Sequence, residues 1–148
     1  MNNFYYACSY PLEVGSVIKP GNWARILKLY TPSQGNPWIM LREKIFEDIR
    51  LAEFSAKPSR WESLFLCESE ESIREFVVTN NRVFDLLYEV ELVDFHAPRH
   101  QGCLIIQSIH QNDNYLSIEQ KAYQYWRSEN IQKPELVTSS PIRIIRCL

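Results

Sequence analysis

The stretch near the carboxyl end of the sequence, residues 134–147, constrains the fold most. Two short apolar runs, residues 135–137 and 142–145, flank a turn at residues 139–141. Runs of β-branched residues separated by Ser and Pro predict two strands joined by a turn. The aromatic opening stretch, residues 3–8, predicts a further strand and is a candidate partner for this pair. We therefore expect strands from both ends of the chain to share a sheet.

Helix signals are clearest after Asn36, which is a good N-cap, with Pro37 at the first helical position. Apolar residues then recur at helical spacing along one stripe: Trp38, Leu41, Ile45, Ile49 and Ala52. We predict a helix over residues 37–54 that buries this stripe. Charged residues, Glu43 and Arg50 among them, occupy much of the remaining helix surface.

The other elements predict a fold class. Further helices are expected at residues 22–30, after a Ser69 cap and after a capping box that begins at Ser117. Further strands are expected at residues 61–67, 84–93 and 103–106. Helices do not alternate strictly with strands, which favours an α+β fold with a mixed, largely antiparallel sheet. The sequence contains no repeat or linker, so we expect one domain over residues 1–148.

Composition excludes several classes of protein. The 148 residues suit one domain, and the net charge of −2 without a basic run gives no general nucleic-acid signature. Apolar stretches fall far short of the roughly 20 residues that a membrane span needs. The amino terminus lacks the features of a signal peptide. We expect a cytoplasmic protein with no membrane partner, and delivery by a route without a cleaved signal stays open.

Common catalytic and metal-binding motifs are missing. The sequence has no G-x-G-x-x-G loop, no P-loop and no G-x-S-x-G elbow. His96 and His100 have the spacing of helical metal ligands, but Pro98 between them opposes a helix. The four cysteines form no C-x-x-C pair. We therefore expect no metal site.

Several segments follow one another in an order that matches a known family. They are Phe4–Ser9, Leu12–Gly21, Ser63–Cys67, Tyr88–Val90, Glu135–Val137 and Pro141–Ile144. The first two give an aromatic strand and a G-x-x-I-x-P-G loop, and the last two give a strand opened by Glu before a final apolar strand. This order resembles the motifs of small bacterial ADP-ribosyltransferases. The chain also looks like an uncharacterised bacterial family close to them.

The resemblance implies a fold, a reaction and a biological role. The fold would be a split sheet with flanking helices, in which NAD⁺ lies in the cleft between two half-sheets. The reaction would transfer ADP-ribose from NAD⁺ to a macromolecular acceptor and release nicotinamide. Small bacterial proteins of this kind often act as toxins or effectors.

The resemblance also implies roles for individual residues. Glu135 would be the catalytic carboxylate that stabilises positive charge on the ribose. The others would bind NAD⁺: Tyr6, where the family usually has His; the backbone of Ala7; Phe65, stacked on the nicotinamide; and Arg25 or Arg60, paired with the diphosphate. Lys133 stands where arginine-directed members have an acidic residue, which disfavours an arginine acceptor.

Three alternatives stay open. Tyr6 and Phe65 are ordinary core aromatics in the simplest interpretation, and Glu135 is then a solvated strand residue. A second alternative is a catalytically inactive protein that uses the same fold to bind a partner. A third is a nucleic-acid-directed transferase, which predicts a basic surface beside Glu135, formed by Lys133, Arg99 and Arg127.

Overall fold

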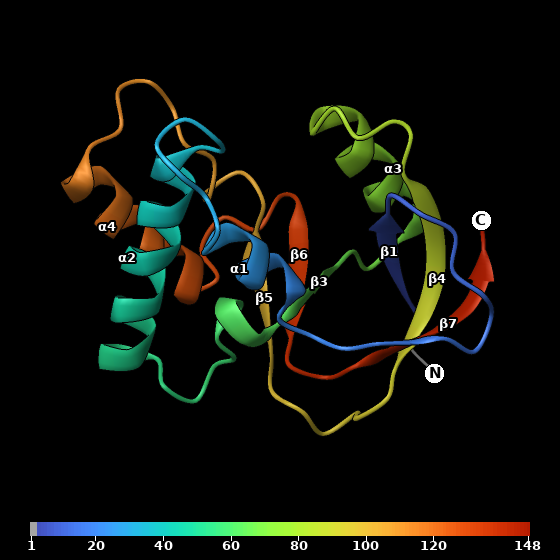
Figure 1. Ribbon diagram of the computed structural model, residues 1–148. Helices are drawn as coiled ribbons and strands as arrows, with labels where there is room; N and C mark the ends of the chain where they lie inside the picture. Colours follow the sequence, from blue (N-terminus) through green and yellow to red (C-terminus); the bar gives the residue numbers. More distant parts are fainter. Residues whose placement is uncertain (1–2) are drawn as a thin grey trace.

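The computed structural model describes residues 3–148 as an α+β fold with two antiparallel sheets (Figure 1). The four-stranded sheet has the order β1 (Phe4–Cys8), β4 (Leu86–Leu92), β7 (Ile142–Cys147) and β2 (Val17–Ile18). The three-stranded sheet has the order β3 (Leu64–Leu66), β6 (Pro134–Thr138) and β5 (Arg99–Cys103). Every strand pair in these two sheets is antiparallel, which confirms the predicted class and the antiparallel pairing.

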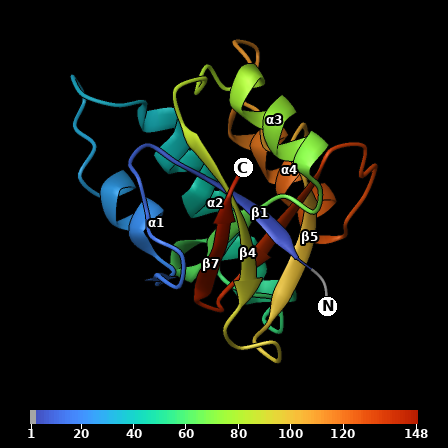
Figure 2. The same cartoon turned by 90° about the vertical axis from the view of Figure 1, so that its right-hand side faces the viewer.

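The helices cover the sheets from two sides. They are α1 (Asn22–Leu27), α2 (Pro37–Glu53), α3 (Glu70–Thr79) and α4 (Tyr115–Trp126), with a 3₁₀ turn at Arg60–Glu62. Helices α2 and α4 pack together against the three-stranded sheet, whereas α3 packs beside β1 (Figures 1 and 2). No helix within residues 3–148 is long and apolar enough to cross a membrane.

Two helix caps form as predicted and one does not. The Asn36 side chain accepts a hydrogen bond from the backbone of α2, and Ser69 does the same for α3. Helix α4 begins before the predicted site, because Asn114 is its N-cap. Ser117 lies at the third helical position and completes a capping box with Asn114, so the prediction of Ser117 as the N-cap is wrong.

The last two strands do not pair with each other, contrary to expectation. Strand β6 pairs with β3 and β5, β7 pairs with β4 and β2, and β1 pairs with β4. Residues 139–141 therefore carry the chain from one sheet to the other. Ser140 is buried at this crossing, where its hydroxyl accepts from the Asp94 N–H (2.9 Å) and donates to the Pro141 carbonyl (2.6 Å). These bonds fix a crossover segment in place of a hairpin turn.

Two other strands have shifted bounds. Residues 60–62 form the 3₁₀ turn, so the strand expected from residue 61 begins only at Leu64. The strand expected at residues 103–106 instead ends at Cys103. Strand β5 is an edge strand of three polar residues followed by Gly102 and Cys103, and it carries no apolar run that would reveal it.

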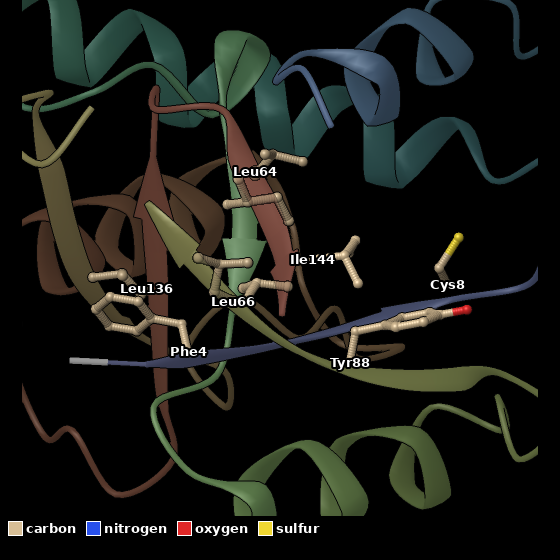
Figure 3. Close-up of a cluster of buried hydrophobic side chains, with 9 residues drawn as sticks. Phe4, Cys8, Leu64, Leu66, Tyr88, Leu136 and Ile144 are labelled. Carbon is tan, nitrogen blue, oxygen red and sulfur yellow. The ribbon is translucent and has the colours of Figure 1, made fainter. Parts of the chain in front are cut away.

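The two sheets touch at one point and separate beyond it. The backbones of Tyr5 and Cys67 exchange two hydrogen bonds of 2.9 Å, which form an isolated antiparallel bridge. Side chains from both sheets fill part of the space between them (Figure 3): Phe4, Cys8, Leu64, Leu66, Tyr88, Leu136 and Ile144. Beyond the bridge, β1 and β3 have no ladder between them and line a cavity.

Candidate functional site

A cavity of about 440 Å³ lies between β1 of one sheet and β3 of the other. Its volume is in the range of small-molecule sites. Four of the six residues implied by the family resemblance line it: Tyr6, Ala7, Phe65 and Glu135. They come from β1, β3 and β6, and they line the space that is left where the two sheets separate.

Glu135 is buried, with 5% of its surface exposed, and its carboxylate is held by three donors. Oε2 accepts from Arg60 Nη1 and from the Tyr125 hydroxyl, each at 2.9 Å. Oε1 accepts from Gln107 Nε2 at 3.3 Å. A buried carboxylate with this many partners has a fixed orientation. Glu135 is therefore not a solvated strand residue, and it lines the cavity from a rigid position.

Arg60 lies at the centre of this buried network and is 3% exposed. Its Nη1 donates to Tyr125 and Glu135, its Nε donates to Glu43, and its Nη2 donates to Glu43 and Gln107. A guanidinium has five N–H donors, so these partners use all of them. The role implied for Arg60 in binding a diphosphate does not fit this geometry, because no donor is left for a phosphate oxygen. Arg60 instead orients Glu135.

Charge is balanced within the network. Burial acts to lower the pKa of Arg60, but Glu43, Tyr125 and Glu135 raise that pKa well above its ordinary value. Burial acts to raise the pKa of Glu43, but Arg60 and Arg42 outweigh burial and hold that pKa below its ordinary value. The ion pairs join Glu43 to both arginines and Arg60 to Glu135. Paired charges of this kind can stay ionised inside a protein.

Local sequence places the members of the network. Ser59 begins the 3₁₀ turn that carries Arg60: its hydroxyl accepts from the Trp61 N–H and donates to Glu47 of α2. Across the three-stranded sheet, Gly102 of β5 lies opposite Glu135. A Cβ atom at Gly102 would lie 2.2 Å from Cε2 of Tyr125. The missing side chain therefore leaves room for the ring whose hydroxyl reaches Glu135.

The aromatic residues at the cavity have different surroundings. The Phe65 ring meets Trp23 edge to face at 5.0 Å and lies 4.7 Å from the Arg60 guanidinium carbon. Burial raises the pKa of Tyr6 to about 12, so its hydroxyl stays protonated and can donate a hydrogen bond near neutral pH. Arg25 bonds to Asn22 on the exposed surface of α1 and is not among the residues that line the cavity.

A second cavity of about 660 Å³ adjoins the first. The two share six lining residues: Trp23, Phe65, Phe76, Arg82, Leu104 and Glu135. Lys133 lines the second cavity and pairs with Glu75 at 2.6 Å, whereas Arg99 and Arg127 line neither. The basic surface expected beside Glu135 is therefore limited to Lys133 among the three residues named for it. Within residues 3–148, no cluster of three or more His, Cys, Asp or Glu could hold a metal ion.

Sequence reasoning missed four residues around Glu135: Glu43, Arg82, Gln107 and Tyr125. Glu43 and Gln107 both contact Arg60, which lies 17 and 47 positions away from them in the sequence. Tyr125 contacts Glu135, which lies 10 positions away on a different element. No local pattern encodes such pairs. Only Tyr125 gave a signal, as part of the predicted buried face of the last helix, and that signal concerned burial alone.

The fold and the cavity define a two-sheet α+β protein with a rigid carboxylate at the split between its sheets. The chain belongs to a family of proteins of unknown function, DUF2441, whose model matches residues 19–147. Phe65 and Glu135 fall within the match, and Tyr6 and Ala7 precede it. No curated protein matches the chain.

Proposed function

We propose that this protein binds NAD⁺ in the cavity between its sheets and transfers ADP-ribose to a macromolecular acceptor. One observation carries the proposal: Tyr6, Ala7, Phe65 and Glu135, implied separately by their sequence motifs, line a single cavity. A split between two antiparallel sheets is also what the family resemblance implies for the NAD⁺ site. An ADP-ribosyltransferase-like fold is part of the same proposal.

The reaction requires a carboxylate beside the ribose. The bond between ribose C1′ and the nicotinamide nitrogen breaks, and nicotinamide leaves with the electron pair. The ribose gains oxocarbenium character, and the nucleophile of the acceptor attacks C1′ and loses its proton. A fixed negative charge stabilises this developing positive charge without reorganisation. Glu135 fits this role because Arg60, Tyr125 and Gln107 hold it in one orientation.

The other cavity residues fit the binding of NAD⁺. Phe65 offers a ring already oriented by Trp23, against which a planar ligand can stack. Tyr6 offers a protonated hydroxyl for a ribose oxygen. Ala7 lies on the stretch of β1 past the bridge at Tyr5, and its carbonyl faces the Arg82 guanidinium. The backbone of β1 is therefore available to a carboxamide once that contact is exchanged.

The inactive alternative also rests on an observation. All three donors to Glu135 belong to the protein, and a carboxylate of this kind can serve structure alone. A non-catalytic member would bind a ligand in the cavity without cleaving it. The same experiment therefore has to separate NAD⁺ binding from nicotinamide release.

The test is nicotinamide release from NAD⁺ by the purified protein, with cell lysate as the source of acceptor. We compare the native chain with Glu135→Gln and with Glu91→Gln, a charge-matched control on β4 that lines neither cavity. Release by Glu135→Gln should fall by roughly a hundredfold or more, and release by Glu91→Gln should stay native. Labelled NAD⁺ would then identify the modified acceptor.

Two measurements make the result decisive. Circular dichroism and urea unfolding show whether Glu135→Gln keeps its fold, since the change leaves Arg60 with one carboxylate fewer. Phe65→Ala removes no buried charge and should weaken NAD⁺ binding in calorimetry. NAD⁺ binding without release would favour the inactive alternative. Absence of both binding and release would refute the proposed function. Native release by Glu135→Gln would refute the catalytic role of Glu135.

A further inference from the structure

Arg82 is the arginine that lies where the two cavities meet. It follows α3 and precedes β4, it lines both cavities, and 43% of its side chain is exposed. A ligand that extends from one cavity into the other must therefore pass its guanidinium. Neither arginine implied by sequence has this position, because Arg25 lies outside both cavities and Arg60 has no free donor.

Two polar contacts hold the Arg82 guanidinium at the cavity, and both involve Nη2. Nη2 lies 2.5 Å from Asp85 Oδ2 and 3.5 Å from the Ala7 carbonyl oxygen. The guanidinium carbon lies 5.5 Å from the centre of the Phe76 ring. Within residues 3–148, apart from the ion pair with Asp85, this side chain makes one hydrogen bond, the long contact to Ala7. A contact of this length is weak and readily exchanged.

We infer that Arg82 binds the diphosphate of NAD⁺, an inference that rests on the proposed function. A guanidinium fork matches phosphate oxygens, and charge-assisted bonds of this type are among the strongest in proteins. The nicotinamide end would lie beside Ala7 and Phe65, and the diphosphate would lie at the boundary of the two cavities. The exchange of the Ala7 contact for a phosphate contact would also free the β1 backbone for the carboxamide.

Asp85 lowers the net positive charge at this site, because its carboxylate faces the Arg82 guanidinium and partly neutralises it. Removal of that negative charge should strengthen the attraction between Arg82 and a diphosphate. Asp85→Asn is therefore a variant whose expected effect is opposite in sign to that of Arg82→Gln.

The test is binding by calorimetry, with NAD⁺, ADP-ribose and nicotinamide riboside as probes. Loss of one charge-assisted contact should weaken the binding of NAD⁺ and ADP-ribose to Arg82→Gln by roughly tenfold or more. The riboside carries no phosphate, so Arg82→Gln should bind it as the native chain does. Asp85→Asn should bind NAD⁺ more tightly, and Arg143→Gln, at an exposed arginine that lines neither cavity, should match the native chain for all three probes.

The outcomes separate this inference from the proposed function. Native affinity of Arg82→Gln for NAD⁺ would overturn the role of Arg82 and leave the proposed function intact. Equal weakening for NAD⁺ and the riboside would also overturn it, because the loss would not depend on phosphate. If the native chain binds none of the probes, the inference falls together with the proposed function.

Discussion

At the scale of single residues, Gly102 offers a direct test of the Glu135 network. An alanine Cβ at this position would lie 2.2 Å from the Tyr125 ring, which is itself fully buried. Overpacking of this kind costs about 2–3 kcal/mol. Gly102→Ala should therefore lower the free energy of unfolding in urea by that amount. It should also displace the Tyr125 hydroxyl from Glu135 and reduce any nicotinamide release.

The neighbouring exposed residue supplies the control for Gly102. Gln101→Ala lies on the same strand and should change stability by about 0.5 kcal/mol or less. An unfolding midpoint of Gly102→Ala equal to that of the native chain would show that Tyr125 can move without loss. The close packing of Tyr125 against β5 would then not be what orients Glu135.

Burial of charged residues could not be predicted from the sequence. Glu43 lies in a helix whose apolar stripe was predicted, and its spacing assigned it to the polar remainder. The structure instead buries it, because Arg60, 17 residues away, neutralises it. Hydrophobic periodicity indicates which apolar side chains are buried, and it cannot indicate an ion pair between distant segments. The sequence resemblance predicted Tyr6, Ala7, Phe65 and Glu135, whereas the residues that orient Glu135 belong to no motif.

At the scale of elements, local signals located the helices, although α4 begins before the predicted cap and α1 ends before residue 30, and they did not predict strand pairing. The Asn36 cap is correct because a cap depends on residues two or three positions apart. The pairing of β6 with β7 was wrong because two apolar runs and a short turn also describe a crossing between sheets. Which sheet a strand joins is decided by its partners elsewhere in the chain, here β3, β5 and β4.

The crossing itself can be tested at Ser140. This side chain is fully buried and bonds to the Asp94 N–H and the Pro141 carbonyl. Ser140→Ala would remove the acceptor of the Asp94 N–H and one of two donors to the Pro141 carbonyl, which keeps its bond from the Val93 N–H. We expect the free energy of unfolding to fall by about 1–2 kcal/mol. Ser139→Ala, at a half-buried neighbour that contributes only its backbone to Pro98, should leave stability nearly unchanged. Equal midpoints for the two variants in urea would show that the Ser140 hydroxyl does not fix the crossing.

At the scale of the whole molecule, the candidate site exists because the chain builds two sheets instead of one. The bridge between Tyr5 and Cys67 holds the sheets together at one end, and the crossing at residues 139–141 connects β6 to β7. Between these two points the walls of the cavity come from separate sheets. The core of the three-stranded sheet with α2 and α4 supports Glu135 from behind. Damage to this core should therefore reach the site through Tyr125.

His100 connects the stability of this core to pH. It is buried on β5, where Nε2 lies 2.9 Å from the Tyr125 carbonyl and Nδ1 lies 3.2 Å from Lys57 Nζ. The carbonyl can only accept, so Nε2 carries the hydrogen and Nδ1 accepts from Lys57. Burial, followed by the Lys57 charge, lowers the pKa of His100 from 6.5 to about 4. The folded protein therefore keeps this imidazole neutral, whereas the unfolded chain protonates it below pH 6.5.

This difference predicts how stability changes with pH. Between the two pKa values the unfolded chain binds a proton that the folded chain does not, so stability falls as pH falls. From about pH 7 to about pH 4.5, His100 should remove about 2–3 kcal/mol from the free energy of unfolding. His100→Gln can keep both hydrogen bonds without a titrating group, so urea unfolding of this variant should lose less stability over that range. His96→Gln, at an exposed position, should behave as the native chain does. If native protein and His100→Gln lose the same stability, His100 does not hold its neutral form in the fold, and the acid sensitivity of the core has another source.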